Sequence, residues 1–165
     1  MSIKIDGIEK MTKTQRLSYI NLLLKGQLDT ESDWIANLAN ASAIIKAVIE
    51  DLNWAGFYLM KENELVLGPF QGLPACNRIA IGKGVCGTAV LKKQTVLVED
   101  VHSFEGHIAC DSASESELVV PIIIKDRVIG VLDLDSPKKA RFGEEEKIAF
   151  EKFVATLVQK YEDSF

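Results

Sequence analysis

The sequence predicts an α+β fold, in which a central antiparallel sheet of about six strands has N- and C-terminal helices packed on one face. Apolar residues recur at helical spacing near both ends of the chain. Between them, short apolar or alternating segments are separated by Gly, Asn and Lys, which is typical of strands and turns. Only residues 125–127 separate the last two of these segments, so we expect a β-hairpin there.

Two helices are expected before the sheet. Thr14 is a candidate N-cap for the first helix, and Gly26 is expected to close it. The second helix is expected to start at Asp29 or Thr30 and to run to about Leu52, with apolar residues along one face.

The sheet and a third long helix follow. The third helix is expected at about residues 144–162, where three glutamates at its start suit the helix dipole. A short helix is expected at 85–93, and the polar segment 101–116 is expected to be a long functional loop. The expected strands are 56–60, 65–70, 78–81, 95–98, 117–124 and 128–135.

Length and composition indicate one globular domain. The chain has 165 residues, within the usual size of a single domain, so we expect one domain over residues 1–165. Residues 1–53 supply the N-terminal helices of this domain, and residues 54–135 supply the sheet. Hydrophobic residues make up 47% and charged residues 26% of the chain, which argues against a disordered or fibrous protein.

Charge and hydropathy exclude several classes of partner. The net charge of −5 gives no general attraction for phosphate backbones, so no nucleic-acid partner is expected. No apolar run reaches the roughly 20 residues that a membrane span needs. The N-terminus has no apolar signal-peptide core. We therefore expect a cytoplasmic protein without a membrane partner, whose cysteines are not a structural disulfide framework.

Three carboxylates are candidates for a binding site. Alternate residues of a strand share a face, so Asp133 and Asp135 point the same way, and the predicted hairpin places Glu117 beside Asp135. Such a cluster repels itself unless it is a solvated edge with cations nearby. The alternative is a pocket for a cationic group, in which one acid can also hold and donate a proton.

The three cysteines, Cys76, Cys86 and Cys110, leave three interpretations open. They can be small core residues, or Cys110 and another cysteine can join His102 and His107 in a zinc site. They can also be a pair of attacking and resolving thiols in redox catalysis. A position near a helix start, expected for Cys86, lowers a thiol pKa.

These features together resemble the GAF domain family, and more specifically its stand-alone free methionine-(R)-sulfoxide reductases. The resemblance spans about residues 14–161. The spacing of the cysteines fits, with ten residues from Cys76 to Cys86 and twenty-four from Cys86 to Cys110. The matching segments are Gly106-His107-Ile108-Ala109-Cys110-Asp111, Ser116-Glu117, Val120-Pro121, Gly84-Val85-Cys86-Gly87 and Leu132-Asp133-Leu134-Asp135-Ser136.

The resemblance implies a role for each cysteine. Cys110 is expected to be the nucleophile that attacks the sulfoxide sulfur, and Cys76 to resolve the resulting sulfenic acid as a disulfide. Cys86 is expected to be auxiliary. Thioredoxin is the expected external reductant, and no bound cofactor or metal is expected. Pairing through the terminal helices, common among such proteins, predicts a homodimer.

The resemblance also implies a substrate pocket. Free methionine sulfoxide carries an ammonium group, which Glu117, Asp133 and Asp135 are expected to bind while they polarise the sulfoxide. Trp54 and Tyr58 share one face of a strand, where core packing would explain them equally well. The resemblance places both aromatic rings around the methyl group of the substrate.

Two further interpretations stay open. The chain can be a GAF module that only binds a small ligand, or a thiol redox sensor without a reductase cycle. Such a sensor would lose thiols to peroxide but would not turn over sulfoxide. One residue departs from the family pattern, since Glu105 stands where such loops often have Pro, and this change can loosen the loop over Cys110.

Overall fold

The protein is a six-stranded antiparallel sheet with strand order β3-β2-β1-β6-β5-β4. The computed structural model describes residues 3–108 and 110–165, so Ala109 of the predicted loop lies outside the described residues. The strands are β1 (Trp54–Lys61), β2 (Glu64–Gln71), β3 (Arg78–Ala80), β4 (Val96–Val98), β5 (Ser116–Ile124) and β6 (Arg127–Ser136). Each expected strand is present, with bounds displaced by two residues at most.

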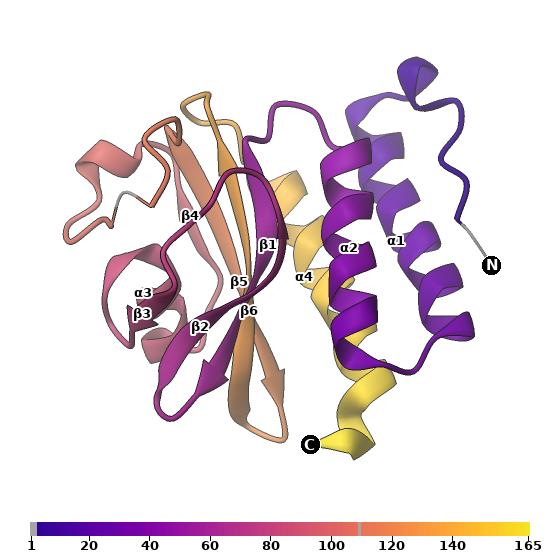
Figure 1. Cartoon of the computed structure of the whole chain (residues 1–165). Coiled ribbons are helices and arrows are strands. Elements are labelled where there is room, and N and C mark those ends of the chain that lie inside the picture. The colour runs from indigo at the N-terminus through magenta and orange to yellow at the C-terminus, as the bar shows by residue number, and fades with distance from the viewer. Residues whose placement is uncertain (1–2, 109) are drawn as a thin grey trace.

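Helices cover the two faces of the sheet unequally (Figure 1). The long helices α1 (Lys13–Thr30), α2 (Trp34–Val48) and α4 (Glu144–Tyr161) pack together on one face, which confirms the predicted arrangement. The short helix α3 (Gly84–Lys92) and the segment between β4 and β5 lie on the other face. Among the described helices, none is long and apolar enough to cross a membrane.

The bounds of the N-terminal helices differ from the predicted ones. The N-cap of α1 is Thr12 rather than Thr14, because Thr12 and Gln15 form a reciprocal capping box. The helix continues through Gly26 to Thr30, since buried leucines on both sides of this glycine hold it against the core. Helix α2 begins later than predicted, because Asp33 caps it by accepting a hydrogen bond from the Ala36 amide.

The β5–β6 hairpin has the predicted register. Glu117 pairs with Asp135, and Lys125 and Asp126 form the tight turn with positive φ values of 48° and 63°. Alternate residues of the two strands separate cleanly between the faces of the sheet. Leu132 and Leu134 belong to the apolar core beneath the long helices, whereas Val131 belongs to the smaller cluster on the opposite face. The acidic residues therefore lie on the face away from the three long helices.

We predict opposite effects for two Gly→Ala substitutions. A Cβ at Gly26 would meet no atom within 4 Å, so Gly26→Ala should raise the free energy of unfolding by about 0.8–1.0 kcal/mol through helix propensity. A Cβ at Gly56 would lie 2.3 Å from the Phe70 Cβ and 2.7 Å from its Cα, so Gly56→Ala should lower it by about 1–3 kcal/mol. Urea unfolding measures both. A fall in stability for Gly26→Ala would contradict the continuous helix.

Candidate active site

The predicted site residues meet in one small cavity between the sheet, α3 and the loop before β5. The cavity has a volume of about 30 Å³, which is enough for one or two water molecules but not for an amino acid. Its lining includes Trp54, Tyr58, Ala75, Gly84, Cys86, His107, Ile108, Cys110, Asp111, Ser114, Glu117, Asp133 and Asp135. Seven of the eight predicted site residues thus line the cavity, and the eighth, Cys76, is joined to Cys110 by a disulfide.

Cys76 and Cys110 form a disulfide at the edge of this cavity. Their Cα atoms are 5.3 Å apart although 34 residues separate them in the chain. The bond ties the connection between β2 and β3 to the loop before β5. The carbonyl of Cys76 accepts a hydrogen bond of 3.0 Å from the Tyr58 hydroxyl, which fixes this side of the bond to β1. The prediction that two of the cysteines are redox partners is thus compatible with the structure.

The carboxylates of Glu117, Asp133 and Asp135 are not a solvated edge. Glu117 and Asp133 are each only 6% exposed. Burial, followed by repulsion from Asp133, raises the pKa of Glu117 and that of Asp135 well above the ordinary carboxyl value. Burial also raises the pKa of Asp133 to about 6. Among the described residues, no group donates a hydrogen bond to Asp133 Oδ1, so a buried acceptor faces the cavity unpaired.

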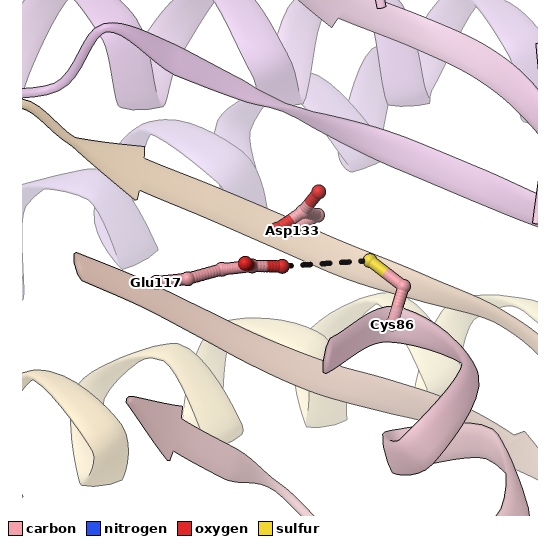
Figure 2. A group of neighbouring side chains, drawn as sticks. All are labelled: Cys86, Glu117 and Asp133. Carbon is pink, nitrogen blue, oxygen red and sulfur yellow. Dashed lines mark hydrogen bonds between the residues drawn. The ribbon is translucent and has the colours of Figure 1, made fainter. Parts of the chain in front are cut away.

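Cys86 lies in the first turn of α3, with its side chain directed at two of these acids (Figure 2). Its thiol donates a long hydrogen bond of 3.9 Å to Glu117 Oε1. Burial, and then the charges of Asp133 and Glu117, raise the pKa of this thiol well above its usual value. The expected lowering by the helix N-terminus is therefore wrong, because desolvation and the carboxylates outweigh the helix dipole.

Aromatic rings form the wall of the cavity. Trp54 stacks on Tyr58 with 5.8 Å between ring centroids and on Phe70 with 5.1 Å. The indole N–H of Trp54 donates to the Leu73 carbonyl at 3.2 Å, which fixes the ring against the connection that carries Cys76. The predicted common face of Trp54 and Tyr58 is confirmed, and no pattern in the sequence marks Phe70 as a member of this wall.

His107, a candidate zinc ligand from its sequence, is part of the cavity wall in the structure. Its Nε2 lies 3.8 Å from Glu117 Oε2, and its side chain is 15% exposed. Burial and the nearby His102 lower the pKa of His107, so its imidazole is neutral over more of the physiological range. The one signal in the sequence was its place three residues before Cys110.

A polar anchor holds the loop that carries Cys110. The Asn53 amide, just before β1, donates to Asp111 Oδ2 at 2.8 Å and to Ser114 Oγ at 3.0 Å. Ser114 also bonds to the carboxyl of Asp135, which partly offsets the rise in its pKa. Glu105, where the family pattern often has Pro, is exposed on the same loop. No motif or spacing in the sequence marks Asn53 or Ser114 as a site residue.

The structure does not support the alternative zinc set. Cys76 and Cys110 share a disulfide and offer no thiolate, and His102 is on the surface, with its Nε2 3.2 Å from Glu115 Oε2. The ligand atoms of Cys86, Glu117 and Asp133 do lie within 4.8 Å of one another. These three side chains instead form hydrogen bonds with one another in the acid cluster described above.

The curled antiparallel sheet, with three long helices on one face and a small cavity under a short helix and loops on the other, defines a GAF domain. Residues 40–159 match the family described as GAF domain. The chain therefore belongs to the GAF domain family, and the fold class inferred from the sequence is confirmed.

The relatives of the chain within this family are closely similar. A free methionine-R-sulfoxide reductase of Escherichia coli is 48% identical over 89% of each chain. One of Saccharomyces cerevisiae is 44% identical over 91% of this chain and 87% of its own length. The X-ray structure of the Neisseria meningitidis enzyme in complex with its substrate superposes with a TM-score of 0.91 at 39% identity, covering 99% of this chain and 96% of the other.

We predict that Glu117→Gln changes the pH dependence of stability. Since the folded chain raises the pKa of Glu117, this carboxyl favours folding below its unfolded pKa of about 4.3, and that contribution is lost as the pH rises toward the folded pKa. Glutamine cannot ionise. The melting temperature of Glu117→Gln relative to the wild type should therefore rise by about 3–6 °C between pH 5 and pH 8. Calorimetry at both pH values measures the shift.

Glu151→Gln is the matched control for this measurement. Glu151 is exposed on α4, away from the acid cluster, so its substitution should leave the difference from the wild type constant with pH. If the melting curves of wild type and Glu117→Gln shift in parallel with pH, the Glu117 carboxyl does not take up a proton on folding.

Proposed function

We propose that this chain reduces the free amino acid L-methionine-(R)-sulfoxide to L-methionine. The observation that carries the proposal is a disulfide, Cys76–Cys110, at the edge of a cavity that is lined by three acids and an aromatic wall. Reductases of this name, 44–48% identical over most of the chain, support it. A substrate complex of a similar protein adds further support.

The acid cluster suits the ammonium group of a free amino acid. Asp133 has an unpaired buried oxygen. Burial raises the pKa values of Glu117, Asp133 and Asp135, and repulsion from Asp133 adds to the rise for Glu117 and Asp135. A bound ammonium would stabilise the ionised forms of these acids. An acid that still holds its proton would donate it to the sulfoxide oxygen as the S–O bond weakens. The rings of Trp54 and Tyr58 would pack on the methyl group.

The reaction in this proposal has three steps. The Cys110 thiolate attacks the sulfoxide sulfur, and with one proton the oxygen passes to Cys110 as a sulfenic acid while methionine leaves. The Cys76 thiol then condenses with the sulfenic acid, which releases water and forms the disulfide. A dithiol such as thioredoxin returns two electrons and two protons to restore both thiols. No bound cofactor is needed.

The disulfide form is a closed state of the site in this scheme. A cavity of about 30 Å³ cannot admit methionine sulfoxide, so the bond must be reduced and the loop before β5 displaced before substrate enters. Cys86 acts as an auxiliary thiol, and its pKa is raised by burial and by the neighbouring acids. We further propose a cytoplasmic homodimer.

Substitutions of the two disulfide cysteines should have different effects. Cys110→Ser should release no methionine even in a single turnover, because it lacks the nucleophile. Cys76→Ser, with Cys86 also changed to Ser, should release about one methionine per subunit and then stop with thioredoxin, because no thiol resolves the sulfenic acid. Rapid quench and amino-acid analysis measure the burst. Methionine release by Cys110→Ser would reject this assignment, and a redox sensor would release none from the wild type.

Free and blocked substrates should be strongly discriminated. N-acetylation removes the ammonium charge and leaves the buried acids unpaired, so kcat/KM should fall at least about 100-fold, and peptide-bound methionine sulfoxide should behave likewise. The (S) epimer exchanges the lone pair and the methyl group, so it should also react poorly. NADPH consumption with thioredoxin and its reductase measures each substrate. Equal kcat/KM for free and N-acetylated substrate would mean that the three acids form no ammonium site.

A further inference from the structure

Exposed apolar side chains divide into two groups on this protein. Among the described residues, eight large apolar side chains are exposed. Four lie on the helical layer or at the C-terminus: Leu22, Ile35, Ile148 and Phe165. The other four lie on the opposite side of the sheet, around the segments that carry the disulfide: Leu73, Ile81, Leu91 and Ile108. We call this second group the apolar rim.

Two members of the apolar rim are close to the disulfide by chain connection alone. Leu73 is three residues before Cys76, and Ile108 is two residues before Cys110. A chain advances at most about 3.6 Å per residue, so these Cα atoms lie within about 11 Å of their cysteines. Leu73 is 66% and Ile108 38% exposed. Both exposed side chains therefore belong to the two segments that the S–S bond joins.

The turn between β3 and α3 connects the other two members to Ile108. A Cβ built on Gly82 would lie 3.5 Å from Leu91 Cδ2, and one built on Gly84 would lie 3.3 Å from Ile108 Cγ1. Ile81 begins this turn and is 39% exposed. The side chains of Ile81, Leu91 and Ile108 thus all border the turn between β3 and α3. Figure 1 shows β3, α3 and the loop before β5 together on this side of the sheet.

We propose that the apolar rim is the docking surface for a protein that carries a reactive dithiol within an apolar surface and reduces the Cys76–Cys110 bond. One partner thiolate attacks a sulfur of the disulfide and forms a mixed disulfide, and the other protein sulfur leaves as a thiolate that takes up a proton. The second partner thiol then displaces the first. The protein gains two electrons and two protons, and the partner becomes a disulfide.

The composition of the rim favours a protein partner over a small charged thiol. Burial of exposed Leu and Ile side chains gives binding energy only to a partner that covers them with apolar surface. Two members of the rim, Leu73 and Ile108, lie on the segments joined by the bond that such a partner must reach. A third member, Leu91, is as exposed as Leu22 on the helical layer. This inference goes beyond the proposed function by naming the surface through which the site would be reduced.

The test is the rate of reduction of the disulfide, without any sulfoxide present. Oxidised protein is mixed with reduced thioredoxin, and free thiols are trapped by alkylation and counted by mass spectrometry. Leu91→Ser and Leu73→Ser should each lower the second-order rate constant about tenfold, and the double variant more. Leu22→Ser, on a side chain 65% exposed like Leu91, is the matched control and should react as the wild type does.

Dithiothreitol separates docking from the chemistry of the bond. This small dithiol needs no apolar rim, so all variants should be reduced by it at rates within about twofold of the wild type. Thioredoxin rates that stay within twofold in Leu91→Ser and Leu73→Ser overturn the inference. Equal losses with thioredoxin and dithiothreitol also overturn it, because the side chains would then act on the disulfide itself. Since no sulfoxide is used, the outcome is independent of whether the proposed reductase activity is correct.

Discussion

The rest of the site depends on the burial of two carboxylates, Glu117 and Asp133, with the half-buried Asp135 beside them on one face of the β5–β6 hairpin. Cross-strand pairing places Glu117 beside Asp135, and Asp133 lies on the same face of β6. Three carboxyl groups this close together, with little access to water, cannot all ionise without a cation nearby. At least one of them must therefore hold a proton. The thiol of Cys86, which faces the same acids, stays protonated for the same reason.

The main apolar core and the candidate active site lie on opposite faces of the sheet. The larger apolar cluster lies between the sheet and the three long helices, and it includes Phe150, Phe153 and Leu157 of α4. The opposite face carries the acids, the aromatic wall and the disulfide, under shorter elements and loops. A self-repelling acid cluster is tolerated there because the helical layer buries enough apolar surface to hold the sheet together.

The sequence predicted features that depend on local periodicity. The two-residue alternation of β6 sufficed to place Asp133 and Asp135 together, and the short gap at residues 125–127 sufficed for the hairpin. Burial of the acids is not visible in the sequence, because it depends on α3 and the loop before β5, which reach the hairpin only in the folded chain. The Cys86 pKa was predicted in the wrong direction for that reason, since a helix start is visible in a sequence and desolvation is not.

Helix ends show the same limit on a smaller scale. Thr14 and Thr12 are equally plausible caps by type, and only the reciprocal bond with Gln15 selects Thr12. Gly26 resembles a helix end by its residue type, yet the buried side chains around it keep the helix intact. The placement of Asn53 and Ser114 as anchors of the loop depends on contacts between distant segments, for which one sequence holds no pattern.

The two tryptophans of the chain lie on opposite faces of the sheet, which makes them separate optical reporters. Trp34 packs edge-on against Tyr161 in the helical layer, with 4.7 Å between ring centroids. Trp54 is in the aromatic wall, fixed to the connection that carries Cys76. With Trp34 replaced by Phe, the remaining tryptophan fluorescence comes from Trp54 in the cavity wall alone. Opening and closing of the site can then be followed in time by intrinsic emission, without an attached dye.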